Sequence, residues 1–410
     1  MVGAGFKPAR MDRKIKISSW FQTRPYKKII KKMKRINVIL AALSIFGLMT
    51  GCGGFEGGST NTSAQNEIQT SAEVHGITIT LNAKEKVRFA LCGSNETHID
   101  WGDGSSATVT LNPNADDINP QIFEHCYPQA SEYIITITGE YINMLICNEM
   151  NIKNIQLNTP LLKLLSCNYN PLTVLDVSKC PKLEKLSCEG NPVTNLDVSK
   201  NTALKILWCT DSQLTNLDLS ANRALYELSC SNNPLKNLDI SKNTAMKTLW
   251  CTNTLLTSLD VSKNMALKYL ECDENKITSL DVTQNTDLEA LNCVANQLTN
   301  LDVSKNTKLK TLFCGNNQLT SLDISKNTEL NHFNCYNDQL TTLDVYQNTK
   351  LYDISCEKNQ MSAEALNALF HALHNNTYEN VYKTININDN PGTETCNHTI
   401  VEKKGWTMDY

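Results

Sequence analysis

The sequence predicts an α/β-type solenoid, a right-handed coil with a parallel β-sheet on its concave side, preceded by a small all-β sandwich. Three observations carry this prediction. Residues 143–361 recur with a period of 21 residues and place a cysteine at the same point of each unit. Residues 73–142 contain short runs in which apolar and polar residues alternate, the period of half-buried strands. Residues 362–410 begin with a helical spacing and close the array.

The repeat unit reads L-x-x-L-x-C-x-x-N-x-L-T-x-L-D-V-S-K-N-T-x when it is aligned on its cysteine. Leu312 and Cys314 stand two apart on a short strand, so both point into the coil, while Phe313 points out of it. One coil buries too little apolar surface alone, so stacked coils form the core and their strands form one sheet. The unit resembles the leucine-rich repeat, with cysteine in the second leucine position.

The cysteine column begins at Cys147 and continues, after a first step of 20 residues, at steps of 21 through Cys167, Cys188, Cys209, Cys230, Cys251, Cys272, Cys293, Cys314, Cys335 and Cys356. Stacking sets these side chains parallel, which is poor disulfide geometry, so we expect buried free thiols; disulfides and metal binding are the alternatives. Cys180 replaces an asparagine outside the column and is expected to be the most accessible thiol.

Two polar columns accompany the cysteines. The asparagine after each strand, such as Asn317, is expected to bond neighbouring backbone groups where the chain turns. Stacked carboxylates raise a calcium hypothesis, but lysine and Ser or Thr recur just after them, so we prefer turn bonding and charge balance. The carboxylates are Asp176, Asp197, Asp218, Asp239, Asp260, Asp281, Asp302, Asp323 and Asp344.

Residues 1–51 have the character of a targeting segment. They hold 12 Lys or Arg against one acid, Asp12, and the whole chain carries −4, so residues 52–410 carry −15. Met33-Lys34-Arg35 precedes an apolar run over residues 38–49, the pattern of an export signal. That run is too short for a mature membrane span.

Residues 48–52, Leu-Met-Thr-Gly-Cys, resemble a bacterial lipobox. The resemblance implies that Cys52 is lipidated and becomes the mature N-terminus. Residues 1–32 are then an over-extended start, with Met1, Met11 and Met33 as alternative first residues. Residues 52–72 are rich in Gly, Ser, Thr and Asn, which predicts a flexible tether.

Residues 100–105, Asp-Trp-Gly-Asp-Gly-Ser, together with 125–127 and 133–139, resemble a PKD-like sandwich of the immunoglobulin type. Asp100 and Asp103 beside glycines suit a tight turn, which we prefer to a catalytic or metal pair. Cys92 and Cys126 are candidates for a disulfide across the sheet, a question that the sequence leaves open.

A C-terminal cap is predicted over residues 362–410. Ser362 precedes a helical pattern of leucines and phenylalanine, and residues 384–390 repeat the strand signature once more. His371 and His374 stand three apart on the helix, but no third metal ligand is apparent, so we expect solvated histidines.

Specificity is expected at the outward strand positions, because their identity changes from coil to coil. We hypothesise ligand binding by Trp208, Trp250, Tyr269, Glu271, Asp273, Phe313, His332 and Tyr336. The two tryptophans, two coils apart and about 10 Å from each other, are expected to form an exposed contact platform. Cross-strand packing among neighbouring side chains is the alternative.

Several function classes fit the sequence poorly. The acidic body lacks the basic face that nucleic acid requires. The sequence contains no Gly-rich phosphate loop, zinc-ligand spacing or nucleophile elbow. His332 is three residues from Cys335 and points to the other side of its strand. The sequence therefore predicts a protein that is not an enzyme and needs no metal or cofactor.

The whole chain resembles surface lipoproteins of gut Bacteroidetes with internalin-like leucine-rich repeats. The resemblance implies a monomeric recognition or adhesion protein, anchored in the outer membrane through a lipid on Cys52 and exposed at the cell surface. Its concave face, from Trp208 to Tyr336, is expected to bind a protein partner. The alternative is a glycan-binding lipoprotein of a polysaccharide-uptake system, with the sandwich as a spacer.

Overall fold

A computed structural model describes residues 75–83, 86–377 and 382–409. All of them belong to one compact unit. Residues 1–51, the predicted tether over 52–72 and the predicted lipidation site Cys52 lie outside the described residues. Two sheets build the unit, one of five strands and one of 15.

The strands of the sandwich lie in both sheets. The five-stranded sheet has the order β4-β3-β6-β1-β8, and β5-β2-β7 form one end of the 15-stranded sheet. The strands are β1 (Gly76–Ala83), β2 (Lys86–Gly93), β3 (Glu96–Asp100), β4 (Ser106–Thr110), β5 (Gln121–Cys126), β6 (Ser131–Thr138), β7 (Ile142–Ile146) and β8 (Ile152–Asn158).

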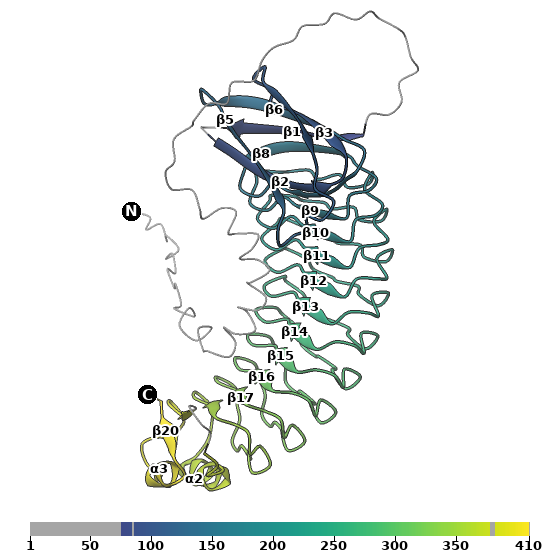
Figure 1. The fold of residues 1–410 in the computed structure, drawn as a ribbon. Coiled ribbons are helices and arrows are strands. Elements are labelled where there is room, and N and C mark those ends of the chain that lie inside the picture. Colours follow the sequence, from purple (N-terminus) through teal and green to yellow (C-terminus); the bar gives the residue numbers. More distant parts are fainter. Residues whose placement is uncertain (1–74, 84–85, 378–381, 410) are drawn as a thin grey trace, which may run out of the picture. The chain divides into compact units, whose positions relative to one another are not determined.

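The solenoid follows as a ladder of three-residue parallel strands, each paired with the next in sequence order (Figure 1). Its strands are β9 (Leu164–Ser166), β10 (Lys185–Ser187), β11 (Ile206–Trp208), β12 (Glu227–Ser229), β13 (Thr248–Trp250), β14 (Tyr269–Glu271), β15 (Ala290–Asn292), β16 (Thr311–Phe313), β17 (His332–Asn334) and β18 (Asp353–Ser355). Each residue pairs with its equivalent 21 positions later, as Leu249 does with Leu270. The predicted solenoid with a parallel sheet is confirmed.

The sandwich and the solenoid share β7 and one hydrophobic core. β7 pairs antiparallel with β2 and parallel with β9, and the next segment, β8, pairs with β1 in the five-stranded sheet. The predicted boundary at residue 142 therefore falls where β7, a strand of both parts, begins. Because an uncovered first coil would expose apolar core and an unpaired strand edge, the sandwich acts as the N-terminal cap of the solenoid.

The column cysteines are fully buried free thiols with almost no exposed surface. Each follows a buried apolar residue of its coil by two positions, as Cys314 follows Leu312. Burial raises their pKa values far above that of an ordinary thiol, so they fill the core rather than react. Cys92 is also a free thiol, so no disulfide joins it to Cys126.

The expectation that Cys180 is accessible is wrong. Cys180 stands in a second column, the asparagines of Ser-Lys-Asn, and this column is buried as completely as the thiols. Asn264, a typical member, donates its amide hydrogens to the carbonyls of Ile240 and Asn243 at 3.1 and 2.9 Å. Cys180 instead contacts the hydroxyl of Thr159 at 3.5 Å. The asparagines of this column donate to backbone carbonyls that are buried inside the coil. The Ser-Lys-Asn turn that contains Cys180 therefore faces the interior rather than the solvent.

The asparagines after the strands also hold neighbouring coils together. Asn275 donates through Nδ2 to the carbonyls of Cys251 and Cys272 at 2.8 and 3.0 Å. Its Oδ1 accepts the backbone N–H of Leu256 at 3.0 Å. One amide side chain therefore satisfies backbone groups of two coils, as the sequence predicted.

The aspartate column forms tight turns. Asp302 accepts the backbone N–H of Ser304 at 2.9 Å, and the same contact recurs at all nine positions. These hydrogen bonds to the charged carboxylate hold the pKa of Asp302 below its usual range. The turn interpretation is confirmed for this column. Asp100 in the sandwich makes a similar turn, since its carboxylate accepts the N–H of Gly102 at 2.9 Å.

The C-terminal cap consists of α2 (Ala363–Ala372), β19 (Lys383–Asn386), α3 (Thr399–Lys403) and β20 (Trp406–Met408). Ser362 accepts the N–H of Ala365 at the start of α2, and β19 continues the ladder from β18. His371 is exposed as expected. His374 is not solvated, because it contacts the carbonyl of Leu351 at 2.6 Å, and burial lowers its pKa.

Candidate binding surface

The outward positions of β9–β18 form three rows along the concave face, at three before, one before and one after each column cysteine. The interior positions between them, such as Leu249 and Cys251, are completely buried. The face divides into two parts with different chemistry. One lies around β10–β12 and the other around β13–β17.

The first part contains an internally satisfied cluster, which we call the N-terminal set: Asp117, Lys185, Trp208 and Glu227. The ammonium of Lys185 lies 4.7 Å from the ring centroid of Trp208 and 3.7 Å from the carboxylate of Asp117. The indole N–H of Trp208 donates to Glu227 at 2.9 Å. Burial lowers the pKa of Lys185 and raises that of Glu227, while the attraction between the two opposes both shifts.

The expectation that Trp208 is exposed is wrong, because only 6% of its surface is accessible. Its ring is covered by the cation of Lys185, and its one donor already has an acceptor in Glu227. Asp117 reaches this place from the segment between β4 and β5, so the sandwich takes part in the cluster. Trp208 therefore has the environment of a structural residue.

The second part holds what we call the C-terminal set: Trp250, Tyr269, Asp273, Glu274 and Tyr336. Trp250 and Tyr269 are half-buried, and Glu274 is exposed. Asp273 is only 5% exposed and accepts a hydrogen bond from the hydroxyl of Thr252 at 2.8 Å. Burial, with a smaller contribution from Glu274, raises the pKa of Asp273 to about 6.

Tyr336 lies over the backbone of the neighbouring coil. A Cβ atom on Gly315 would stand 2.5 Å from the Tyr336 ring, so only glycine admits the ring at this distance. Burial raises the pKa of the Tyr336 phenol, and Glu357, Glu274 and Asp273 add to the shift. The phenol therefore lies in the electrostatic field of carboxylates that follow β14 and β18 in the sequence.

The remaining hypothesised residues are distributed as follows. Glu271 and Phe313 are half-buried in the row one before the cysteine, in β14 and β16. Between them β15 presents Ala290 and Asn292, followed by Val294. We call Ala290, Asn292 and Val294 the small-residue strip, because they separate two regions of large side chains.

His332 is 8% exposed and belongs to a polar network. Its Nδ1 lies 3.0 Å from a carboxylate oxygen of Asp353, and its Nε2 lies 2.7 Å from the hydroxyl of Tyr352. Thr384 donates to the other oxygen of Asp353 at 3.2 Å. Cys335, the nearest thiol in the sequence, points into the core and is fully buried. The network holds β17, β18 and β19 together.

Asp338 is a buried carboxylate that the predictions from the sequence did not include. It occupies the asparagine position after β17 and accepts the N–H groups of Asn317 and Leu319 at 3.0 and 3.2 Å. Its other carboxylate oxygen is buried without a partner, where neighbouring coils place an amide Nδ2 that donates to backbone carbonyls. Burial raises the pKa of Asp338 to about 7, which favours the protonated acid because only that form can donate there.

The signal for Asp338 was present in the alignment of the repeats. It is the one acidic residue in a column otherwise occupied by Asn, Ser or Thr between residues 170 and 359. The presence of an aspartate does not by itself reveal that its pKa is raised, because an exposed aspartate would keep an ordinary pKa. The raised pKa follows from the buried backbone carbonyls around the column.

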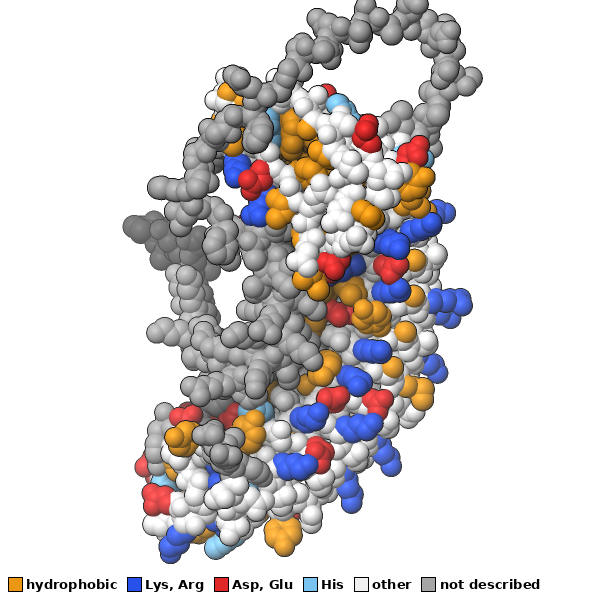
Figure 2. Space-filling view, in the orientation of Figure 1, with side chains coloured by type: hydrophobic (Ala, Val, Ile, Leu, Met, Phe, Trp, Pro, Cys, Tyr) orange, Lys and Arg blue, Asp and Glu red, His pale blue; other side chains and the backbone are white. Residues whose placement is uncertain are grey.

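One edge of the solenoid carries ion pairs between successive coils. Lys205 lies 2.6 Å from Glu184, and Lys350 lies 2.6 Å from Glu329. Figure 2 shows blue and red side chains next to one another along the stacked coils. These pairs are exposed at the surface, so each contributes little stability, and their charges are already balanced.

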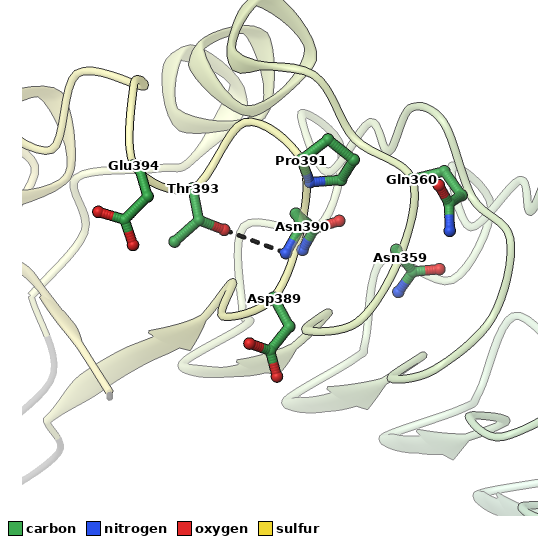
Figure 3. A pocket seen from close by; sticks show the side chains of 7 residues that line it. All are labelled: Asn359, Gln360, Asp389, Asn390, Pro391, Thr393 and Glu394. Carbon is green, nitrogen blue, oxygen red and sulfur yellow. Dashed lines mark hydrogen bonds between the residues drawn. The ribbon is translucent and has the colours of Figure 1, made fainter.

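A cavity of about 520 Å³ lies at the end of the array, between the last coils and the cap (Figure 3). Asn359 and Asn390 line it, but their amides are bonded to backbone carbonyls, including that of Cys356. Thr393 accepts the N–H of Asn390 at 3.1 Å. These three side chains therefore serve the cap, and we place the candidate site on the concave face.

Within the described ranges, no three His, Cys, Asp or Glu side chains are grouped to hold a metal ion. The helices of the described part of the chain also lack the length and apolar character of a membrane span.

Comparison with known proteins supports the architecture. No protein-family model matches the sequence, and no curated protein matches it. Among solved structures, the chain is similar to the functional domain of InlJ from Listeria monocytogenes, which includes a cysteine ladder. The two share 34% identity with a TM-score of 0.58, over 65% of this chain and 58% of that one. The chain has the leucine-rich-repeat fold.

A second similar structure is the internalin inlF from Listeria monocytogenes, with 20% identity and a TM-score of 0.54. The match covers 65% of this chain and 86% of that one. These similar structures are internalin-type leucine-rich-repeat proteins. Since this chain spans only 58% of the InlJ structure, the activity and partners of that protein do not transfer directly.

Proposed function

We propose that this protein is a non-catalytic recognition protein of the cell surface, whose concave face binds a protein partner. The observation that carries the proposal is the C-terminal set, where Trp250 and Tyr269 remain half-exposed beside carboxylates. Aromatic side chains in such positions are the usual centres of protein interfaces. Internalin-type leucine-rich-repeat folds are generally protein-interaction modules, which supports the same conclusion.

The surface location rests on the sequence of the N-terminal segment. The lipobox-like residues 48–52 and the preceding apolar run support export and a lipid anchor on Cys52, in the manner of Bacteroidetes outer-membrane lipoproteins. The tether over 52–72 would then separate the anchor from the PKD-like sandwich. Metabolic labelling with a fatty-acid analogue tests this step: the native chain should incorporate label and Cys52→Ser should not. Equal labelling of both would contradict the anchor.

The binding proposal is tested with Trp250→Ala/Tyr269→Ala in the full chain. Captured host and bacterial proteins are identified with the native chain, and their affinities are compared between variants. We expect at least about tenfold weaker binding, because two aromatic contacts are lost. Tyr346→Ala/Tyr382→Ala is the matched control, since these side chains are 67% and 88% exposed outside the concave rows. Equal affinity of both double variants would refute the concave-face proposal.

A glycan array probed with the same proteins examines the alternative function. Aromatic rings beside carboxylates also suit sugar stacking, so glycan binding is the outcome that would replace a protein partner. Binding of neutral glycans that is lost in Trp250→Ala/Tyr269→Ala, without any captured protein, would favour the polysaccharide-uptake reading.

A further inference from the structure

We propose that the C-terminal set binds a lysine or arginine side chain of a basic, extended segment of the partner protein, as Lys185 is bound within the chain. This inference rests on the proposed function, because it specifies the partner of the same concave face. The occupant is a segment of protein whose cationic side chain inserts between aromatic rings and carboxylates.

The N-terminal set is the internal example of this chemistry. A tryptophan ring, a cation over its face and carboxylates on either side form one cluster on the concave sheet. The cation comes from β10, the ring from β11 and one carboxylate from β12. Cation–π attraction and charge pairing together stabilise an ammonium that is nearly removed from water.

The C-terminal set repeats the rings and the carboxylates but contains no cation of its own. Among the described residues, no lysine or arginine lies over the ring of Trp250, Tyr269 or Tyr336. None of them forms an ion pair with Asp273 or Glu274 either. At the place equivalent to Lys185, one strand before Trp250, stands the acidic Glu227.

Within the described ranges, no lysine or arginine neutralises the carboxylates of Asp273 and Glu274. Asp273 is 5% exposed and has only the hydroxyl of Thr252 as a side-chain donor. Its raised pKa reports the cost of burying this carboxylate beside Glu274. A cation placed here would reverse that cost, because opposite charge favours the ionised form.

The small-residue strip gives the side chain of the partner a place to lie. Strand pairing sets Asn292 beside Glu271, and continuing that register sets Val294 beside Asp273. The methylene groups of a lysine or arginine can pack on Ala290 and Val294 while the charged end reaches Asp273 and Glu274. Tyr336, which lies over Gly315, borders the same position from the other side.

Charge complementarity favours a basic segment over neutral or acidic partners. In the strand rows from β13 to β18 and the residues directly after them, the acids are Glu271, Asp273, Glu274, Asp353 and Glu357, and the one lysine is Lys358. A partner of like charge would meet repulsion across this face. Affinity for a basic segment should therefore fall as salt is added.

The test uses three labelled dodecapeptides of alternating composition, Lys-Thr, Ser-Thr and Glu-Thr, titrated against the full chain. The Lys-Thr peptide should bind at least about tenfold more tightly than the other two. Asp273→Asn/Glu274→Gln should weaken its binding by about tenfold, and so should Val294→Lys, which supplies an internal cation. Glu140→Gln/Glu402→Gln removes the same charge from exposed positions elsewhere and should change the affinity less than about twofold.

The inference is overturned if Asp273→Asn/Glu274→Gln and the control Glu140→Gln/Glu402→Gln lose equal affinity for the Lys-Thr peptide. The attraction would then come from the overall negative charge and not from this site. The inference is also overturned if Val294→Lys binds as well as the native chain while its thermal midpoint is unchanged. Partner binding that is lost in Trp250→Ala/Tyr269→Ala but kept in Asp273→Asn/Glu274→Gln would refute the inference and leave the proposed function standing. Binding that survives in both variants would refute both.

Discussion

The two parts of the concave face contain similar residues and differ in whether those residues satisfy one another. Around β10–β12, Lys185 covers Trp208 and the indole N–H has its acceptor in Glu227. Around β13–β17, Trp250 and Tyr269 stay half-exposed, and none of the lysines and arginines that the structure describes pairs with Asp273. A tryptophan on a repeat surface is therefore informative only together with the charges one strand away. The first cluster is satisfied within the fold, and we propose the second as the site that a partner contacts.

The largest effect that separates the two parts is expected from the tryptophans. Trp208→Ala should lower the free energy of unfolding by about 3 kcal/mol, because it removes a buried ring and leaves Lys185 and Glu227 without their shared contact. Trp250→Ala should lower it by less than about 1 kcal/mol, since its half-exposed ring has less to lose. Urea denaturation of both variants measures the difference. Equal losses would remove the distinction between the two clusters.

A smaller effect is expected at Asp338, in the part of the array that holds the C-terminal set. Its folded pKa, about 7, lies above the ordinary value of 3.8, so the native state holds a proton that the unfolded chain has released. Its contribution to stability is complete below about pH 4 and is lost as the pH rises through about 7. Asp338→Asn should therefore stabilise the protein by roughly 2 kcal/mol at pH 8 and much less at pH 4.

The matched control for Asp338 lies among the first coils. Asn233 holds the equivalent position there and donates to the carbonyls of Cys209 and Cys230. Asn233→Asp should introduce the same loss of stability with rising pH. Thermal midpoints measured from about pH 4 to about pH 8 compare the two variants. A stabilisation of Asp338→Asn that does not change with pH would contradict the protonated carboxyl.

Alanine substitutions at two glycines, Gly315 and Gly190, should each lower the free energy of unfolding by about 1–2 kcal/mol. Alanine at Gly315 would bring its Cβ to 2.5 Å from the Tyr336 ring, and at Gly190 to 2.3 Å from the Tyr169 ring. Both variants should be destabilised, as thermal unfolding would show. Only Gly315→Ala should also weaken partner binding, because only Tyr336 belongs to the C-terminal set. Weaker binding by Gly190→Ala would extend the site toward the sandwich.

The smallest effect concerns the residue two after each column cysteine, where the backbone has positive φ. Gly190 holds this position at φ +67°, whereas Ala295 holds it at φ +55°. Ala295→Gly should raise the free energy of unfolding by about 0.5 kcal/mol, because glycine adopts this conformation without a steric penalty. Denaturant unfolding measures the change. A clear loss of stability would contradict the prediction and show that the larger conformational entropy of glycine in the unfolded chain outweighs the steric relief.

Much of the fold could be predicted because the same 21-residue pattern recurs in every coil. The 21-residue spacing places Leu312 and Cys314 in the core, and the aspartate turns follow from residue type and local spacing. Cys180 was misjudged for a related reason. The sequence shows that Cys180 replaces an asparagine of the repeat, but the burial of that position depends on hydrogen bonds between neighbouring coils.

The candidate site could be predicted only as a set of positions. The sequence placed Trp208 and Trp250 in one row with the same expected role, and pairing Trp208 with Ser229 and Ser229 with Trp250 puts both there. It did not show that Asp117, from the sandwich, meets Lys185 beside only one of them. Such contacts join residues far apart in the chain, so no local spacing encodes them.

By itself, the sequence determined the coil, its period, the buried cysteine column and the outward rows, because these follow from side-chain alternation repeated in every unit. The tertiary structure decided which outward residues are satisfied internally and which remain available. It also decided that the sandwich and the solenoid share a core, and that Asp338 faces backbone carbonyls. Burial and charge pairing depend on neighbours from other coils and from the sandwich, and folding alone brings these neighbours together.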